Sequence, residues 1–277
     1  MIEIKNLNYR YAGSKQQVFQ DFSLTLTENN IYGLLGKNGT GKSTLLYLIS
    51  GLLQARKGMV MFDGMDAADR RPEALQELFI VPEEFDLPAV SLEQYVRMNA
   101  PFYPRFSSEV LESCLSDFEL PTTLQLNSLS MGQKKKVFMS FALAAGTKLL
   151  LMDEPTNGLD IPSKAQFRRV VANNMADDRT LIISTHQVHD VEQLLDHILI
   201  LDQRRLLLDA SVAEICNRYS FEYRTPGSDM SDVIYAEPSL QGNAVITRRA
   251  ENGEETQLNL ELLFDAVTTG ALKNEWK

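Results

Sequence analysis

The stretch Gly36–Ser43 limits the possible folds of this chain more than any other. It reads Gly-Lys-Asn-Gly-Thr-Gly-Lys-Ser and matches the pattern Gly-x-x-x-x-Gly-Lys-Ser/Thr. The apolar run 31–35 before it predicts a buried strand, and residues 43–49 after it predict a helix that Gly51 closes. In such a strand–loop–helix unit, backbone N–H groups and the helix N-terminus surround a phosphate group. The sequence therefore predicts a nucleoside triphosphate site, with a chance match in a glycine-containing turn as the alternative.

The side chains of this loop have distinct expected tasks. The Lys42 ammonium is expected to neutralise the β- and γ-phosphates, and the Ser43 hydroxyl to hold Mg²⁺. The triphosphate of ATP is expected to contact the whole loop and the residue that follows it, namely Gly36, Lys37, Asn38, Gly39, Thr40, Gly41, Lys42, Ser43 and Thr44.

Overall composition narrows the class of protein. The 277 residues suffice for one large domain, with or without a small second one. The net charge of −10 argues against broad electrostatic binding to nucleic acid or anionic lipid. The sequence has neither an uncharged apolar run of about 18 residues nor the pattern of a signal peptide. Its cysteines, Cys114 and Cys216, are expected to be reduced, buried thiols of a cytoplasmic protein.

Polar side chains follow three further apolar runs that predict buried strands. Asp153 and Glu154 follow one run, Glu83 follows another and His186 a third; the runs are 149–152, 78–81 and 180–184. Ligands of parallel α/β sheets gather at the carboxyl ends of the strands. Asp153 is therefore expected to hold Mg²⁺, and Glu154 to polarise an attacking water. Glu83 could reach the same metal or belong to a solvated loop, and His186 could face the ligand or be structural.

Two other features have a functional and a plain interpretation. Tyr11 could stack on a nucleotide base, or be a partly buried strand aromatic. Ser130 and Gln133 form a capping box at the start of a predicted helix that runs to about residue 145. Gly132 allows an anion to approach this helix terminus closely. The next three residues, 134–136, are all lysines that could form a solvated face or lie near phosphate or an acidic partner.

Alternation of predicted strands and helices indicates an α/β fold with a mainly parallel core sheet. Residues 2–9 alternate in polarity and predict an edge strand of an antiparallel β subdomain. The sequence at about 88–146 predicts an inserted helical subdomain. Residues 198–201 and 206–208 predict a last hairpin. We expect a main domain over 1–210 and a small α+β appendage over 211–277, with a helix over 212–219, short strands near 233–235 and 244–247, and a final helix over 258–272.

Taken together, these motifs resemble the ATP-binding subunit of ABC transporters over about residues 1–210. They come in that family's order: Tyr11 at the adenine-stacking position and the Walker A loop at 36–43 are followed by the signature 129–133. Walker B at 149–154, the D-loop at 157–160 and the switch histidine His186 complete the set. The resemblance implies a P-loop ATPase that uses ATP and Mg²⁺.

The resemblance also implies a mechanism and partners. Two subunits are expected to close head to tail on ATP, with Ser130, Gly132 and Gln133 of one reaching the γ-phosphate held by the other. Glu154 is then the general base and His186 the γ-phosphate sensor, while Ser43, Asp153 and Glu83 surround Mg²⁺. The family usually has Gln where this chain has Glu83, which adds negative charge beside the phosphates.

A homodimer on the cytoplasmic face of the membrane, bound to a separate multi-span permease, is the expected assembly, and no nucleic-acid partner is expected. Segment 102–106, the sequence 82–84 and the tail resemble the bacterial antibiotic and drug efflux branch, which favours export. The alternatives are a soluble ABC ATPase acting on the ribosome or nucleic acid, and a regulatory module that closes on ATP with little hydrolysis. The presence of one ATPase unit and an acidic tail argues against the first alternative, and Glu154 with His186 against the second.

Overall fold

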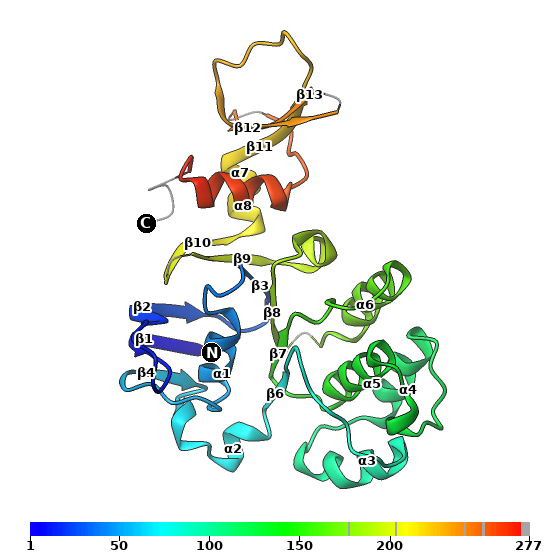
Figure 1. Ribbon diagram of the computed structural model, residues 1–277. Helices are drawn as coiled ribbons and strands as arrows, with labels where there is room; N and C mark the ends of the chain where they lie inside the picture. The colour runs from blue at the N-terminus through cyan, green and yellow to red at the C-terminus, as the bar shows by residue number, and fades with distance from the viewer. Residues whose placement is uncertain (177, 203, 241, 251–252, 273–277) are drawn as a thin grey trace.

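The computed structural model describes residues 1–277 except 177, 203, 241, 251–252 and 273–277. Within the described residues the strands form three sheets, with helices gathered beside the largest one (Figure 1). The N-terminal sheet is antiparallel and has the order β2-β1-β4-β5. Its strands are β1 Ile2–Tyr9, β2 Phe19–Leu26, β4 Lys57–Phe62 and β5 Met65–Asp66. Ile2, Ile4, Leu7 and Tyr9 of β1 are buried, so its burial alternates as the polarity pattern predicts except at an irregularity between Ile4 and Leu7.

The central sheet has six strands in the order β10-β9-β3-β8-β7-β6. The pairs β9–β3, β3–β8, β8–β7 and β7–β6 are parallel, and β10 is antiparallel to β9. The strands are β3 Ile31–Leu35, β6 Leu78–Val81, β7 Leu149–Asp153, β8 Thr180–Thr185, β9 His197–Asp202 and β10 Arg205–Ser211. Every residue of β7 and β8 is buried, because these strands are covered on both faces, and this explains their continuous apolar runs.

Helix α1, Lys42–Ile49, lies between the N-terminal and central sheets. Its buried residues include Leu45 and Leu46, which belong to one apolar cluster with Ile4 of β1 and Leu151 of β7. The packing of α1 between two sheets fixes the loop that precedes it at the carboxyl end of β3.

The chain between β6 and β7 forms a group of helices beside the central sheet, near α6 (Figure 1). The helices of this group are α3 Leu92–Asn99, α4 Ser108–Asp117 and α5 Met131–Ala144. The short helix α2, Pro72–Leu75, precedes β6, and α6, Ile161–Asn174, follows β7. Two 3-10 turns lie among the helices of this group, η2 Ala100–Phe102 and η3 Leu126–Ser128. Three others lie elsewhere: η1 Ala67–Asp69 precedes α2, and η4 Val188–Asp190 and η5 Glu192–Leu194 lie between β8 and β9. The capping box predicted at Ser130 is present, and Ser91 forms another at the start of α3.

The C-terminal region forms the third sheet, of order β11-β13-β12, and packs with two helices beyond β9 and β10 (Figure 1). Its elements are α7 Val212–Arg218, β11 Tyr219–Arg224, β12 Val233–Ser239, β13 Gly242–Arg248 and α8 Leu260–Thr269. Apolar residues of this region, including Ile215 and Leu263, share one buried cluster with Ile198 and Ile200 of β9.

One expectation about the strands was wrong. β1 is not an edge strand, because β2 pairs with one side of it and β4 with the other. The helix expected over 212–219 is confirmed as α7, which ends one residue earlier because Tyr219 starts β11. In the part of the chain that the structure describes, no helix has the length and apolar character needed to cross a bilayer.

Candidate active site

The phosphate loop joins β3 to α1 and has a tightly restrained backbone. A Cβ atom on Gly36 would lie 2.6 Å from the Leu201 carbonyl oxygen and 2.7 Å from Thr40 Oγ1, so only glycine fits there. Gly41 caps α1 with a φ of 108°, a backbone angle that residues other than glycine rarely adopt. The Thr40 hydroxyl donates to the Lys37 carbonyl over 2.9 Å and closes the loop on itself.

The Lys42 side chain points back into this loop. Its ammonium donates to the Gly36 carbonyl over 2.8 Å and lies 3.6 Å from Oε1 of Glu154. Both side chains are about 6% exposed. The structure thus brings the P-loop lysine and the carboxylate at the end of β7 together at one point.

Glu154 adopts a left-handed backbone conformation, with φ of 45°. Such a conformation costs a residue other than glycine about 1 kcal/mol or more, and it turns Glu154 out of the line of β7. Its carboxylate accepts hydrogen bonds from Thr185 Oγ1 over 3.1 Å and from the His186 backbone over 3.4 Å. His186 Nδ1 lies 2.8 Å from Oε1 of Glu154. The end of β8, through Thr185 and His186, and the phosphate-loop Lys42 therefore hold this carboxylate.

Asp153 is the last residue of β7 and is 1% exposed. Burial raises the pKa of its carboxyl, while hydrogen bonds from the hydroxyls of Ser184 and Ser43 act in the opposite direction. Mg²⁺ typically binds one or two protein oxygens, the phosphates and several waters, so the adjacent oxygens of Ser43 and Asp153 fit this ion. Among the described residues, no group of three or more His, Cys, Asp or Glu side chains could hold a metal.

Glu83 lies beside the same site with its own partner. Its Oε1 accepts a hydrogen bond of 2.7 Å from the side-chain amide of Asn157 in the loop after β7. Glu83, Ser43 and Glu154 line one cavity of about 340 Å³ together with Tyr11. The hydrogen bond from the Asn157 amide stabilises part of the negative charge that Glu83 has and the usual glutamine lacks.

Tyr11 lies at the rim of the loop. Its hydroxyl is 2.9 Å from Thr44 Oγ1, its ring packs edge-on against Tyr9 at 5.1 Å, and its side chain is 42% exposed. The structure thus places an aromatic ring beside the phosphate loop. Asn38 and Gly39 line the cavity below Tyr11 and also a neighbouring hollow of about 690 Å³.

The signature residues lie apart from this cavity. Ser130, Gly132 and Gln133 are at the start of α5 and do not line it. The Ser130 hydroxyl accepts from the Gln133 N–H over 3.3 Å, and Ser130 and Gln133 are exposed. Within one chain they do not meet the phosphate loop.

Sequence patterns missed one buried cation of the site. Lys135 is 6% exposed, and its ammonium donates to the backbone carbonyls of Glu154 and Asn157. The triple lysine was the available signal, but spacing alone did not show which lysine faces inward. His189 and His197 lie outside the site: they pair with Glu261 and Asp209, each over 2.7 Å.

Comparison with known proteins agrees with this geometry. The family model described as "ABC transporter" matches residues 19–157. The chain is 30% identical to "ABC transporter ATP-binding protein YtrB" of Bacillus subtilis over 79% of this chain and 75% of that protein. "Linearmycin resistance ATP-binding protein LnrL" of the same species is 28% identical, covering 79% and 71%. "Methionine import ATP-binding protein MetN" of Carboxydothermus hydrogenoformans is 29% identical, covering 78% and 67%.

A solved structure described as the ATP-binding subunit of an ABC transporter superposes with a TM-score of 0.69 at 27% identity, covering 78% of this chain and 91% of that one. The fold, the phosphate loop and the family match lead to one assignment. This chain belongs to the ABC transporter family and is an ATP-binding, ATP-hydrolysing subunit of the kind that powers a membrane transporter.

Proposed function

We propose that this subunit drives export through a separate multi-span permease, by closing as a homodimer on ATP and Mg²⁺ at the cytoplasmic face of the membrane. The observation that supports ATP hydrolysis in this proposal is the cluster formed by Lys42, Glu154 and His186 at the phosphate loop. It combines a cation for phosphate, a carboxylate for water and a histidine that holds the carboxylate. This combination suits phosphoanhydride hydrolysis.

Each predicted site residue has a task in this proposal. The backbone of Gly36–Ser43, with Thr44 and the Lys42 ammonium, binds the phosphates, and Tyr11 stacks on the base. Ser43 and Asp153, with Glu83 nearby, would hold Mg²⁺, which would neutralise negative charge on the phosphates when bound. Glu154 takes a proton from the attacking water, and His186 orients Glu154 and contacts the γ-phosphate.

The position of the signature supports the dimer. Ser130 and Gln133 are exposed, and with Gly132 they do not line the nucleotide cavity of their own chain. The start of α5 offers backbone N–H groups and a positive helix end. We propose that these residues complete the site of a second copy.

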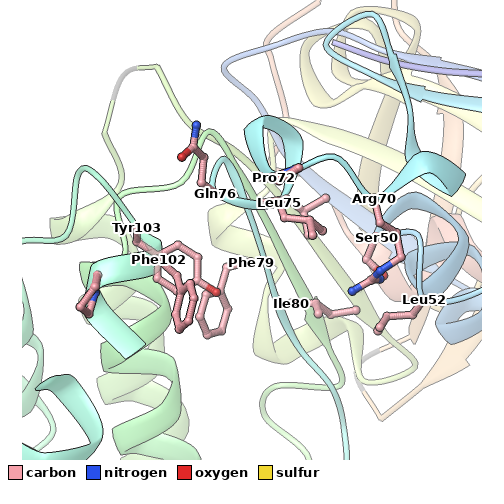
Figure 2. Close-up of a pocket in the computed structure, with 12 residues that line it drawn as sticks. Ser50, Leu52, Arg70, Pro72, Leu75, Gln76, Phe79, Ile80, Phe102 and Tyr103 are labelled. Atoms are coloured by element: carbon pink, nitrogen blue, oxygen red, sulfur yellow. The ribbon is translucent and has the colours of Figure 1, made fainter. Parts of the chain in front are cut away.

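A groove beside β6 is the surface we assign to the permease. It has a volume of about 530 Å³ and lies between η2 on one side and α2 with the end of α1 on the other (Figure 2). Phe102 is 69% exposed and Leu52 is 54% exposed at its two sides, while Phe79 forms its floor. Exposed apolar side chains around a hollow are typical of a docking surface for an apolar segment. Strand β6 then leads directly to Glu83, so a segment in the groove lies next to the nucleotide site.

The direction of transport and the domain organisation complete the proposal. We favour export because the resistance protein LnrL is among the relatives, although an importer subunit, MetN, matches as well. We assign residues 1–210 to the ATP-binding domain, with the helical subdomain at about 88–146. Residues 211–277 form the C-terminal appendage, for which we propose a role in contacts.

Replacement of Glu154 tests the catalytic assignment. Glu154→Gln keeps the size of the side chain but removes its basicity, so kcat for phosphate release should fall by about 10²-fold or more, while ATP still binds. Purified parent and variant are compared by phosphate release and by binding of a fluorescent ATP analogue. Glu112→Gln, an exposed change on α4, is the matched control and should behave as the parent. Equal turnover of parent and Glu154→Gln would exclude Glu154 as the base.

A further inference from the structure

The lysine triplet at the start of α5 contains three side chains with different surroundings. Lys134 is half-exposed, and Lys136 donates to Gln166 of α6 over 2.8 Å. Lys135 is 6% exposed and points to the loop that follows β7. Its ammonium donates to the Glu154 carbonyl over 3.1 Å and to the Asn157 carbonyl over 2.7 Å.

A buried ammonium is costly, so its partners are informative. Removing an ammonium from water costs several kcal/mol unless hydrogen bonds and opposite charges compensate. Burial lowers the pKa of Lys135, and the carboxylates of Glu83, Glu154 and Asp153 oppose that shift. The hydrogen bonds of Lys135 go to two main-chain oxygens rather than to any of these carboxylates. Lys135 therefore fixes the backbone of the loop and adds positive charge beside an acidic site.

The two carbonyls that Lys135 binds belong to residues with roles in the site. Glu154 has the left-handed backbone that turns its carboxylate toward His186. Asn157 holds Glu83 through its side-chain amide. One ammonium thus fixes both ends of the turn 154–157, and through it the two carboxylates that line the cavity.

We propose that Lys135 is a positioning residue for ATP hydrolysis. It holds the turn 154–157 in place, so that the Glu154 carboxylate stays oriented toward the attacking water. Lys135 lies on the same rigid helix as Ser130, about one and a half turns away. It therefore links the start of α5, which faces the second copy, to the base in its own chain. The inference rests on the role proposed above for Glu154.

The test compares Lys135→Met with Lys135→Arg and with Lys134→Met as the matched control. Methionine preserves most of the apolar volume but removes the charge and all donors. The Asn157 carbonyl then loses its hydrogen bond from Lys135, and the Glu154 carbonyl keeps the one from the Asn157 N–H. We expect kcat for phosphate release to fall by about 10-fold or more, since charge-assisted hydrogen bonds of this kind are lost. KM for ATP should stay within about threefold, because the phosphate loop itself is unchanged.

The other two variants distinguish positioning from general packing. Lys135→Arg keeps the charge and the donors and should retain at least about three times the kcat of Lys135→Met. Lys134→Met should match the parent in kcat and KM. Circular dichroism confirms the fold of each variant, and if Lys135→Met does not fold, Lys135→Gln replaces it with the same threshold.

Three results would overturn the inference: kcat of Lys135→Met within twofold of the parent, a rise in KM as large as the fall in kcat, or no advantage of arginine over methionine. Glu154→Gln is measured alongside. If Glu154→Gln retains full turnover, the proposed catalytic function fails. If Glu154→Gln is inactive and Lys135→Met is as active as the parent, only the role of Lys135 fails.

Discussion

At the scale of single residues, the two cysteines show how burial in the core lowers the reactivity of a thiol. Cys114 of α4 is fully buried, and burial raises the pKa of its thiol to about 12. Cys216 of α7 is 4% exposed, and burial raises the pKa of its thiol as well. Because the thiolate is the reactive form, both thiols should be inert in the native protein.

Thiol titration with a chromogenic disulfide reagent at about pH 8 checks this, since a free thiol with a pKa of about 8.5 reacts readily there. The native protein should show almost no reaction, whereas protein unfolded in guanidinium should show two thiols. Rapid reaction of the native protein would mean that α4 or α7 opens far more easily than their packing indicates.

The sequence predicted some site residues and not others for a physical reason. The phosphate loop is local, so its pattern predicts its own conformation. The positions of Glu154 and His186 at strand ends predicted that both side chains lie at the same edge of the sheet. Their direct contact depends on the pairing of β7 with β8, which the sequence pattern does not show. The inward direction of Lys135 depends on how α5 rotates against the loop after β7, and no local pattern encodes that rotation.

At the scale of elements, α5 is the helix that joins the exposed signature residues to the nucleotide site. Its start is exposed at Ser130, Lys135 ties it to the turn after β7, and Arg179 binds its end. The Arg179 guanidinium is buried and donates to the Leu143 carbonyl over 3.0 Å and to the Thr147 carbonyl over 2.9 Å. Together these contacts hold both halves of the helix.

Replacement of Arg179 should therefore destabilise the protein. Arg179→Met removes the guanidinium donor from two carbonyls: Thr147 loses its hydrogen bond, and Leu143 keeps the one from the Gly146 N–H. The free energy of unfolding should therefore drop by about 2 kcal/mol. Urea unfolding followed by circular dichroism measures the change. Arg169→Met removes an arginine that is 54% exposed and also bonds a carbonyl, so it should cost less than about 1 kcal/mol. Equal effects of the two changes would show that Arg179 does not hold α5.

The exposed start of α5 carries a prediction about assembly. Glu154→Gln should form a dimer in gel filtration when ATP and Mg²⁺ are present and remain a monomer without ATP, because slow hydrolysis preserves the closed state. Adding Ser130→Arg places a bulky side chain where the second copy's phosphate should sit, and should abolish the dimer. A monomer in every condition would contradict the two-subunit arrangement for this chain alone.

Strand prediction succeeded where burial was complete and failed where it depended on neighbours. Continuous apolar runs identified β7 and β8 because both faces of these strands are covered. The alternation of β1 showed a half-buried strand but could not show that β4, far along the chain, pairs with its second side. Strand β11 follows α7 without a break, so no turn signal marked its start.

At the scale of the whole molecule, the central sheet joins three regions. The N-terminal sheet and the phosphate loop lie on one side, the helices α3–α5 on another, and the C-terminal sheet with α8 beyond β9 and β10 (Figure 1). The C-terminal elements contribute to the same buried cluster as β9. A hydrogen bond also joins the C-terminal region to the segment that follows His186. Oε1 of Glu192 in this segment accepts from the Leu260 N–H at the start of α8 over 2.7 Å.

The central claim is that this molecule powers a permease docked in the groove beside β6. The most direct test is to tag the chain in its own cells, solubilise the membranes in mild detergent and identify what co-purifies. Phe102→Asp places a charge in the groove, and Tyr223→Asp, at an aromatic that is 65% exposed on β11, is the matched control. Our account predicts a multi-span membrane protein at about one copy per subunit with the parent and with Tyr223→Asp, and its loss with Phe102→Asp. Recovery of ribosomal or nucleic-acid partners, with the chain absent from the membrane fraction, would contradict the account.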